Sequence, residues 1–167
     1  MMTYLLWLSR TAPAVWARES ESIWAYPTIL FLHTLGLGLL VGFTTAIDFR
    51  VLGFSSRLPL APMGRFFRLV WIGFWINALS GTALLVMAPA KLLNPTFAVK
   101  MACIGLGVVT AMWIKREVFP AGLGTGTSDA AGVSTLARIL AVSSLILWAG
   151  AITAGRLMAY IGNGNAH

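Results

Sequence analysis

The stretch WAYPTILFLHTLGLGLLVGFTTAIDFRVLGF, from Trp24 to Phe54, decides the fold. It is apolar on nearly all sides and, at about 1.5 Å per helical residue, long enough to cross a bilayer core of about 30 Å. His33 lies inside the apolar run, and the stretch ends near an Asp48-x-Arg50 pair. The stretch therefore predicts a membrane-spanning helix that carries an unusual polar position.

The composition of the whole chain also indicates a membrane protein. Of its 167 residues, 58% are hydrophobic and 10% are charged, and the mean hydropathy is +0.82. Soluble domains are usually about half apolar and about a quarter charged. The formal net charge is +7, but the basic residues stand at the ends of apolar runs and form no continuous patch. We therefore expect a lipid bilayer, and no nucleic acid, as the partner of this chain.

Three further apolar runs are long enough to span the membrane. The four predicted spans are 26–47, 66–88, 97–114 and 136–161. Asn94-Pro95 is a helix-start signal before the third. Because short loops place neighbouring helices antiparallel, we expect one all-α domain over 1–167, an integral membrane four-helix bundle. Residues 1–23 mix apolar and basic side chains and predict an N-terminal interfacial helix lying on the bilayer.

The positions of the basic residues predict the orientation in the membrane. They gather in the loops after the first and third spans: Arg50, Arg57, Arg65, Lys115 and Arg116. Because cytoplasmic loops carry an excess of Lys and Arg, we expect these two loops in the cytoplasm. In a bacterium, the chain would be a multi-pass inner-membrane protein with its N- and C-termini in the periplasm.

Small residues recur every four positions on three of the predicted helices. The ridges are Thr34, Gly38, Gly42 and Ala46; Gly73, Asn77 and Gly81; and Ala151, Gly155 and Ala159. Such ridges let helix backbones approach closely within lipid. We expect them to form packing faces in the bundle, or faces toward a second copy in a homodimer or toward a partner membrane subunit.

His33 is the first candidate for chemistry, because the only other histidine is the last residue of the chain. His33 and Gly36 fall on one side of the first predicted helix, so the imidazole need not face lipid. Lys100 and Arg156 are expected at a similar depth in the outer half of the membrane. The three side chains would then ring an outward-opening pocket suited to an anionic ligand.

Haem b is one ligand that this pocket predicts. His33 would bind the iron, Lys100 and Arg156 would pair with the propionates, and Gly36 would leave room for the flat macrocycle. The chain has no second internal histidine. Met158 is a candidate second axial ligand, and a homodimer that shares one haem between two His33 side chains is another solution. Copper bound by His33 and methionine, a quinone head group and a lipid phosphate are alternatives.

An alternative interpretation gives His33, Lys100 and Arg156 purely structural roles. His33 would then hydrogen-bond another helix, for instance at Asn77 or Ser80, because an unsatisfied polar group in hydrocarbon is costly. Lys100 and Arg156 would extend to the lipid head groups.

Asp48 and Arg50 form a second constellation, at the inner end of the first span. We interpret them as a structural ion pair, in which no charge is left alone near the bilayer. The chain contains no P-loop, H-E-x-x-H or C-x-x-C motif, so we assign no catalytic residue and favour a protein that is not an enzyme.

One set of residues carries a resemblance to known membrane proteins. It comprises Tyr26-Pro27, His33-Thr34, Gly36, Gly42, Asp48, Arg50 and Gly53, then Ser80-Gly81, Lys91, Asn94-Pro95, Phe97 and Lys100. The set resembles a family of small bacterial four-helix membrane proteins of unknown function and, more loosely, the copper-resistance protein D group and the membrane cytochromes b. The resemblance implies an inner-membrane bundle tied to copper handling or haem-linked electron transfer. It marks as important His33, Asp48, Arg50, Gly81 and Lys100.

Three functions therefore remain open at this point. The first is a haem b or copper-binding redox or metal-handling module that uses His33. The second is a non-catalytic membrane scaffold or a subunit of a larger complex, and the third is a small transporter.

Overall fold

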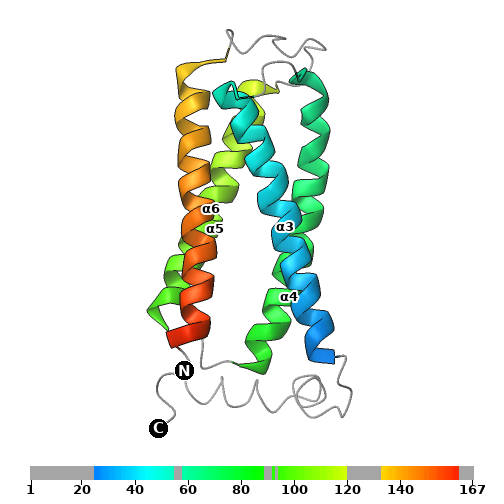
Figure 1. Ribbon diagram of the computed structural model, residues 1–167, viewed down its shortest axis with the longest axis vertical. Helices are drawn as coiled ribbons and strands as arrows, with labels where there is room; N and C mark the ends of the chain where they lie inside the picture. The colour runs from blue at the N-terminus through cyan, green and yellow to red at the C-terminus, as the bar shows by residue number, and fades with distance from the viewer. Residues whose placement is uncertain (1–24, 55–57, 89–91, 93, 120–132, 162–167) are drawn as a thin grey trace.

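The computed structural model describes residues 25–54, 58–88, 92, 94–119 and 133–161. The helices are α3 (Ala25–Leu52), the short 3-10 helix η1 (Ala61–Arg65), α4 (Phe66–Met87), α5 (Pro95–Val118) and α6 (Thr135–Ile161). The four α-helices run alternately up and down along one axis (Figure 1), and the described residues contain no strand. The predicted all-α four-helix bundle is confirmed, whereas the predicted interfacial helix over 1–23 lies outside the described residues.

All four α-helices are long and apolar enough to cross a membrane. The predicted spans 66–88 and 136–161 agree closely with α4 and α6. α3 continues to Leu52 and α5 to Val118, so both helices extend beyond the predicted spans 26–47 and 97–114. The prediction stopped where charged residues begin. In α3, however, Asp48 and Arg50 are buried against the rest of the protein and do not end the helix.

Local sequence explains where two of these helices end and begin. α3 stops at Gly53, which has a φ of 98°, a backbone conformation that favours glycine. The N–H groups of Gly53 and Phe54 then bond back to the Arg50 and Phe49 carbonyls, which closes the helix C-terminus. At the start of α5, the Asn94 side chain accepts a hydrogen bond from the Thr96 N–H and Pro95 follows the cap, as the sequence predicts.

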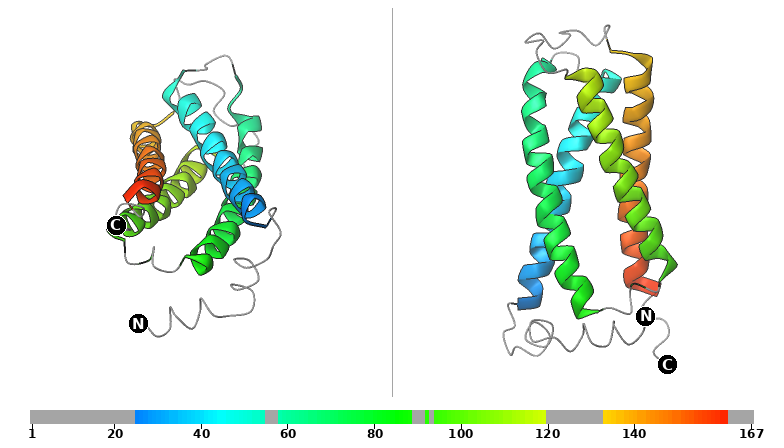
Figure 2. Two further views of the ribbon diagram at one scale, coloured as in Figure 1. Left: turned by 60° about the horizontal axis from the view of Figure 1, so that its bottom comes forward. Right: turned by 180° about the vertical axis from the view of Figure 1, so that it is seen from behind.

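The bundle is made of two helical hairpins. α3 packs along α4 and α5 packs along α6, and the hairpins join mainly through α3 and α6, whereas α4 and α5 make little close contact. Figure 2 shows α4 and α5 on the same side of the bundle without the crossing that joins α3 to α4. Most buried apolar side chains lie near the end where α3 gives way to α4, around Ile47, Leu60 and Ile114.

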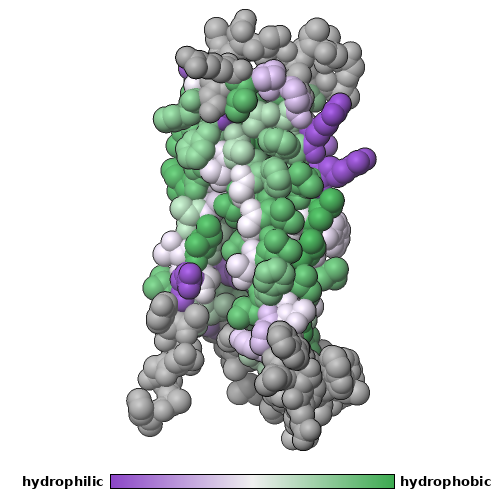
Figure 3. All heavy atoms as spheres, turned by 45° about the vertical axis from the view of Figure 1, so that its right-hand side comes forward, coloured by the Kyte–Doolittle hydropathy of each residue, from purple (hydrophilic) through white to green (hydrophobic). Residues whose placement is uncertain are grey.

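The face of the bundle seen in Figure 3 is largely apolar over its described residues, as a bilayer environment requires. Large exposed side chains such as Trp75, Leu79 and Ile146 lie on its helices. The structure therefore supports a multi-pass membrane protein whose helix sides face lipid.

The small-residue ridges have different outcomes. The ridge of Gly73, Asn77 and Gly81 on α4 does face a neighbouring helix, α3. On the α3 ridge, Ala46 packs against the buried core, whereas the other three residues line no packing face between the described helices. Thr34 is exposed, and a Cβ added at Gly38 or Gly42 would meet nothing within 4 Å. On α6, Ala151 is buried as expected.

Candidate functional site

His33 is held between α3 and α4 by hydrogen bonds. Its Nδ1 lies 3.1 Å from the Asn77 carbonyl oxygen and 3.2 Å from Ser80 Oγ. In return, Asn77 Nδ2 donates to the His33 carbonyl oxygen at 2.9 Å. These are the two residues that the structural interpretation of His33 named. The imidazole also lies directly over Gly81, where an added Cβ would come within 3.0 Å of His33 Cε1.

The hydrogen-bond partners fix the chemistry of the His33 ring. A carbonyl oxygen can only accept, so Nδ1 must carry the hydrogen that points at Asn77. The Ser80 hydroxyl donates its own hydrogen to the Ile76 carbonyl at 2.6 Å and can therefore accept from Nδ1. In the neutral imidazole, Nε2 then keeps its lone pair. His33 thus combines a structural hydrogen bond at one nitrogen with a basic second nitrogen.

Gly36 marks the closest approach of α3 and α4. A Cβ at Gly36 would lie 2.5 Å from the Asn77 backbone nitrogen and 2.9 Å from the Gly73 carbonyl oxygen. Gly73 is equally constrained, with the Leu40 backbone nitrogen 2.7 Å from its added Cβ. The space beside Gly36 is therefore filled by the α4 backbone. The expectation that Gly36 makes room for a macrocycle is wrong, because the glycine serves helix packing.

The other residues of the predicted pocket lie on α5 and α6. The Lys100 side chain passes alongside Gly155 of α6. Arg156 is exposed and Met158 is half-buried, both in the last part of α6. The pocket of His33, Lys100 and Arg156 stays a prediction.

Asp48 and Arg50 are both almost completely buried, at 1% exposure each. Residues two apart on an α-helix point to nearly opposite sides. Arg50 Nε donates to the Leu58 carbonyl at 2.6 Å, whereas the Asp48 carboxyl is near Ser144 of α6. Asp48 Oδ2 and Ser144 Oγ have no hydrogen-bond partner. Arg50 thus fixes the loop through a backbone carbonyl, and the ion pair of Asp48 with Arg50 stays a prediction.

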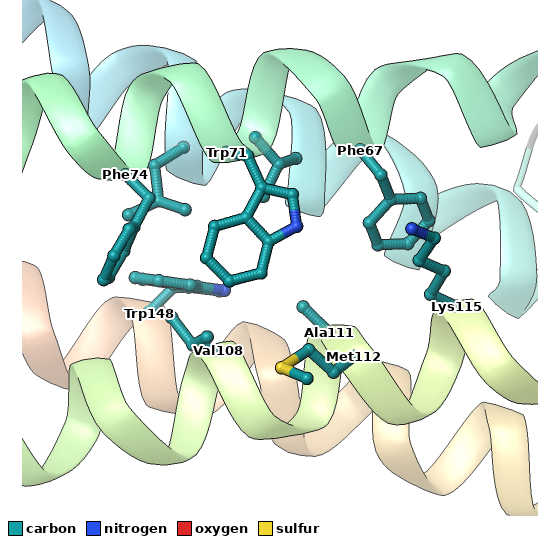
Figure 4. A pocket seen from close by; sticks show the side chains of 10 residues that line it. Phe67, Trp71, Phe74, Val108, Ala111, Met112, Lys115 and Trp148 are labelled. Atoms are coloured by element: carbon teal, nitrogen blue, oxygen red, sulfur yellow. The ribbon is translucent and has the colours of Figure 1, made fainter.

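A second region of interest is the space between α4 and α5, which we call the α4–α5 cleft. It has a volume of about 20 Å³ and is lined by Leu40, Phe67, Val70, Trp71, Phe74, Val108, Ala111, Met112, Lys115 and Trp148. Figure 4 shows the rings of Trp71, Phe74 and Trp148 around this space, with Lys115 beside Phe67 at one end. Neither this cleft nor the adjoining cavity is lined by His33, Lys100, Arg156 or Met158.

Two polar groups border this otherwise apolar cleft. Trp148 is 1% exposed, and its indole Nε1 has no hydrogen-bond partner. The Lys115 ammonium lies 5.6 Å from the centre of the Phe67 ring, a cation–π distance. At this end the cleft adjoins an open cavity of about 480 Å³ lined by Gly64, Arg65, Phe67, Arg68, Trp71 and Lys115. Among the described residues, three cations and no acid line that cavity, so we call it the basic mouth of an apolar space.

The sequence did not reveal the α4–α5 cleft. Lys115 served as a topology signal, and the other residues of the cleft are apolar residues of the four spans. The available signal was the spacing of Phe67, Trp71 and Phe74, which puts large aromatic rings on one side of α4.

No metal site is evident from the side chains in the described ranges. Within residues 25–54, 58–88, 92, 94–119 and 133–161, no three His, Cys, Asp or Glu side chains gather as metal ligands. His33 Nε2 is the one imidazole nitrogen there that could begin such a site. Comparison with protein-family models, with curated proteins and with solved structures gives no match. The site must therefore be interpreted from its own geometry.

Proposed function

We propose that this chain is a non-catalytic membrane scaffold or a subunit of a larger membrane complex. The observation that carries the proposal is the reciprocal contact of His33 with Asn77 and Ser80, which uses the histidine to hold α3 against α4. A polar group buried in a membrane protein is either functional or a link between helices. Here the geometry of Nδ1 supports the link.

The exposed small residues of α3 support a packing partner for this scaffold. Gly38 and Gly42 are exposed and have open space beside them, and small residues at four-residue spacing allow a second helix to approach closely. We propose that a second copy or a partner subunit packs there.

Cysteine crosslinking tests the partner face. Gly38→Cys and Gly42→Cys, each in a Cys103→Ser background, should give a crosslinked product when membranes are oxidised. Gly105→Cys is the matched control, because Gly105 is also exposed with open space but lies on α5. Equal crosslinking at all three positions, or none at positions 38 and 42, would contradict a specific partner face.

A metal-handling module is the second candidate, because of the His33 Nε2 lone pair. A metal-bound histidine usually donates its other ring N–H to a carbonyl or carboxylate, which is the contact that Nδ1 makes with Asn77. A copper ion at Nε2, with methionine ligands, agrees with this arrangement. A haem placed beside Gly36 does not, because α4 fills that space.

Absorption and metal analysis decide between these two candidates. The full chain, purified in mild detergent from cells supplied with haem and copper, should be colourless and free of metal if the scaffold proposal holds. Bound copper or a Soret band that disappears in His33→Ala would establish the second candidate. Thr34→Ala, on the neighbouring exposed position, is the control and should leave any spectrum unchanged.

We also propose a location and an orientation in the inner membrane. The basic residues of the basic mouth and Arg50 lie at the end of the bundle where α3 meets α4, and such residues favour the cytoplasmic side. The resemblance of the Tyr26–Gly53 region to bacterial four-helix membrane proteins supports the same placement. A periplasm-dependent reporter enzyme should be active when fused after His167 and inactive when inserted at 122–129; the opposite result would invert the orientation.

A further inference from the structure

The α4–α5 cleft and its basic mouth form a continuous space with two chemical ends. The two cavities share Phe67, Trp71 and Lys115. The basic mouth carries cations and is open to the surroundings of the protein. The α4–α5 cleft is bordered by the rings of Trp71, Phe74 and Trp148 (Figure 4). We propose that this space binds one anionic glycerophospholipid, with its phosphate at the basic mouth and an acyl chain along the exposed edge of the aromatic cleft, beside Trp71 and Met112.

Charge complementarity identifies the head group. Arg65 and Arg68 of the α4 region and Lys115 of α5 line the mouth from two sides, and no acidic side chain of the described residues lines it with them. Basic pockets between transmembrane helices are suited to acidic lipid head groups. A phosphodiester with no compensating cation of its own, as in phosphatidylglycerol, therefore matches the mouth better than a zwitterionic lipid does.

The indole of Trp148 supplies an independent observation inside the cleft. It is buried at 1% exposure, its Nε1 has no hydrogen-bond partner, and Figure 4 shows this nitrogen directed into the space beside Trp71. A buried N–H without an acceptor is unfavourable, so the occupant should bring an oxygen to it. Hydrocarbon alone does not meet this requirement, whereas the ester carbonyl of a glycerophospholipid does.

The spacing of the two polar groups agrees with a phospholipid. The Trp148 ring packs on Gly107 of α5, and Gly107 and Lys115 are about 12 Å apart along the helix at 1.5 Å per residue. The lysine side chain extends over Phe67 and shortens the gap. An ester carbonyl lies a few bonds below the phosphate, so one lipid can reach both groups while its acyl chain continues past Phe74.

The packing of the helices explains why a lipid can enter. α4 and α5 make little close contact along their length, so the cleft faces the bilayer directly. In a bilayer, phospholipids contact that surface directly, so a lipid needs no separate entry path through the protein. This binding site is independent of whether His33 serves as a helix link or as a metal ligand.

Native mass spectrometry of the full chain tests the proposal. The purified protein is stripped of lipid in detergent and titrated with dioleoylphosphatidylglycerol or dioleoylphosphatidylcholine. One phosphatidylglycerol should bind with at least about tenfold higher affinity, because each charge-assisted contact is worth roughly a factor of ten. Equal affinity for the two lipids, or recovery of a neutral quinone in place of a phospholipid from the membrane extract, would overturn the proposal.

Matched variants locate the site. Lys115→Gln should reduce phosphatidylglycerol affinity about tenfold, whereas Arg116→Gln should not, because Arg116 is an exposed cation of the same helix end that does not line the mouth. Trp148→Phe removes the indole N–H and should reduce affinity severalfold; Trp113→Phe is its exposed control on α5. Equal losses in Lys115→Gln and Arg116→Gln would show surface attraction only and would contradict a defined site.

Thermal unfolding measurements distinguish a loss of lipid binding from misfolding of a variant. Phosphatidylglycerol should raise the melting temperature of the wild-type protein and of Arg116→Gln, and should raise that of Lys115→Gln much less. If Trp148→Phe does not fold, Lys115→Gln still decides the outcome, since its side chain is exposed and supports no core packing. An unchanged lipid-induced shift in Lys115→Gln would refute the site.

Discussion

Helix α4 has two sides that meet their neighbours in different ways. Toward α3 it presents Gly73, Asn77 and Gly81, and there backbone lies against backbone. Toward α5 it presents Phe67, Trp71 and Phe74, and the two helices stay apart around a cleft. Within lipid no hydrophobic effect draws helices together, so the size of the side chains decides which helices touch. The same helix can thus seal one interface and leave another open to a ligand.

The most severe test of the sealed interface is to add a side chain at its closest point. Gly36→Val would drive a Cβ into the Asn77 nitrogen and the Gly73 oxygen, both backbone atoms that cannot move alone. We expect the free energy of unfolding to fall by about 3 kcal/mol or more. Chemical denaturation in detergent micelles, followed by circular dichroism, measures it.

Gly105→Val provides the control for helix propensity, because it makes the same change at an exposed position of α5 where nothing lies within 4 Å. It should leave the free energy of unfolding unchanged or raise it by less than about 1 kcal/mol, because valine is more favourable than glycine inside a helix. If the two variants were equally stable, the close approach of α3 and α4 at Gly36 would be incorrect.

The hydrogen bonds across the sealed interface are the next test. His33→Ala and Asn77→Ala should each reduce the free energy of unfolding by about 1–2 kcal/mol, since interhelical hydrogen bonds in membranes are modest. Because the two residues bond reciprocally, the double variant should lose less than the sum of the single losses. Strict additivity in this double-mutant cycle would show that the contact carries no coupling.

The number and type of helices could be predicted from the sequence because hydropathy depends only on length and composition. The sequence did not predict which face of each helix packs against its neighbours. On α3, Gly36 with Leu40 and Gly38 with Gly42 offer two nearly equivalent small or apolar faces, and only the position of Gly73 on the partner helix selects the first. The correct ridge on α4 was unambiguous because it contains both the polar Asn77 and two glycines.

The candidate site was harder to predict for a related reason. His33 stood out because a polar side chain in an apolar span is rare, and the alternative partners Asn77 and Ser80 could be named in advance. The α4–α5 cleft depends on where two helices fail to touch, which is a property of their tertiary arrangement. Trp148 shows this most clearly, since it is one apolar residue among many in its span, yet it is 1% exposed and borders the cleft.

A smaller effect, of opposite sign, is expected at Asp48. Its carboxyl is 1% exposed, Oδ2 has no hydrogen-bond partner, and Arg50 bonds to the loop. Burying an uncompensated charge is unfavourable, so Asp48→Asn should leave the free energy of unfolding unchanged or raise it by about 1 kcal/mol. Ser143→Ala, at a half-buried position of α6, is the control for the loss of a polar group nearby. A loss of stability in Asp48→Asn would indicate that the carboxylate is paired after all.

The open side of α4 should matter least for folding. Lys115 is exposed, and its contact in the cleft is the ring of Phe67 at 5.6 Å, an interaction worth about 0.5 kcal/mol at such sites. In lipid-free detergent, Lys115→Gln should therefore change the free energy of unfolding by no more than about 0.5 kcal/mol, as Arg116→Gln should. A residue that lines a cleft without stabilising the fold, and that nevertheless governs lipid affinity, is what a binding surface requires. If Lys115→Gln instead destabilised the lipid-free protein as much as His33→Ala, the basic mouth would belong to the folding core, and the contrast between the two sides of α4 would disappear.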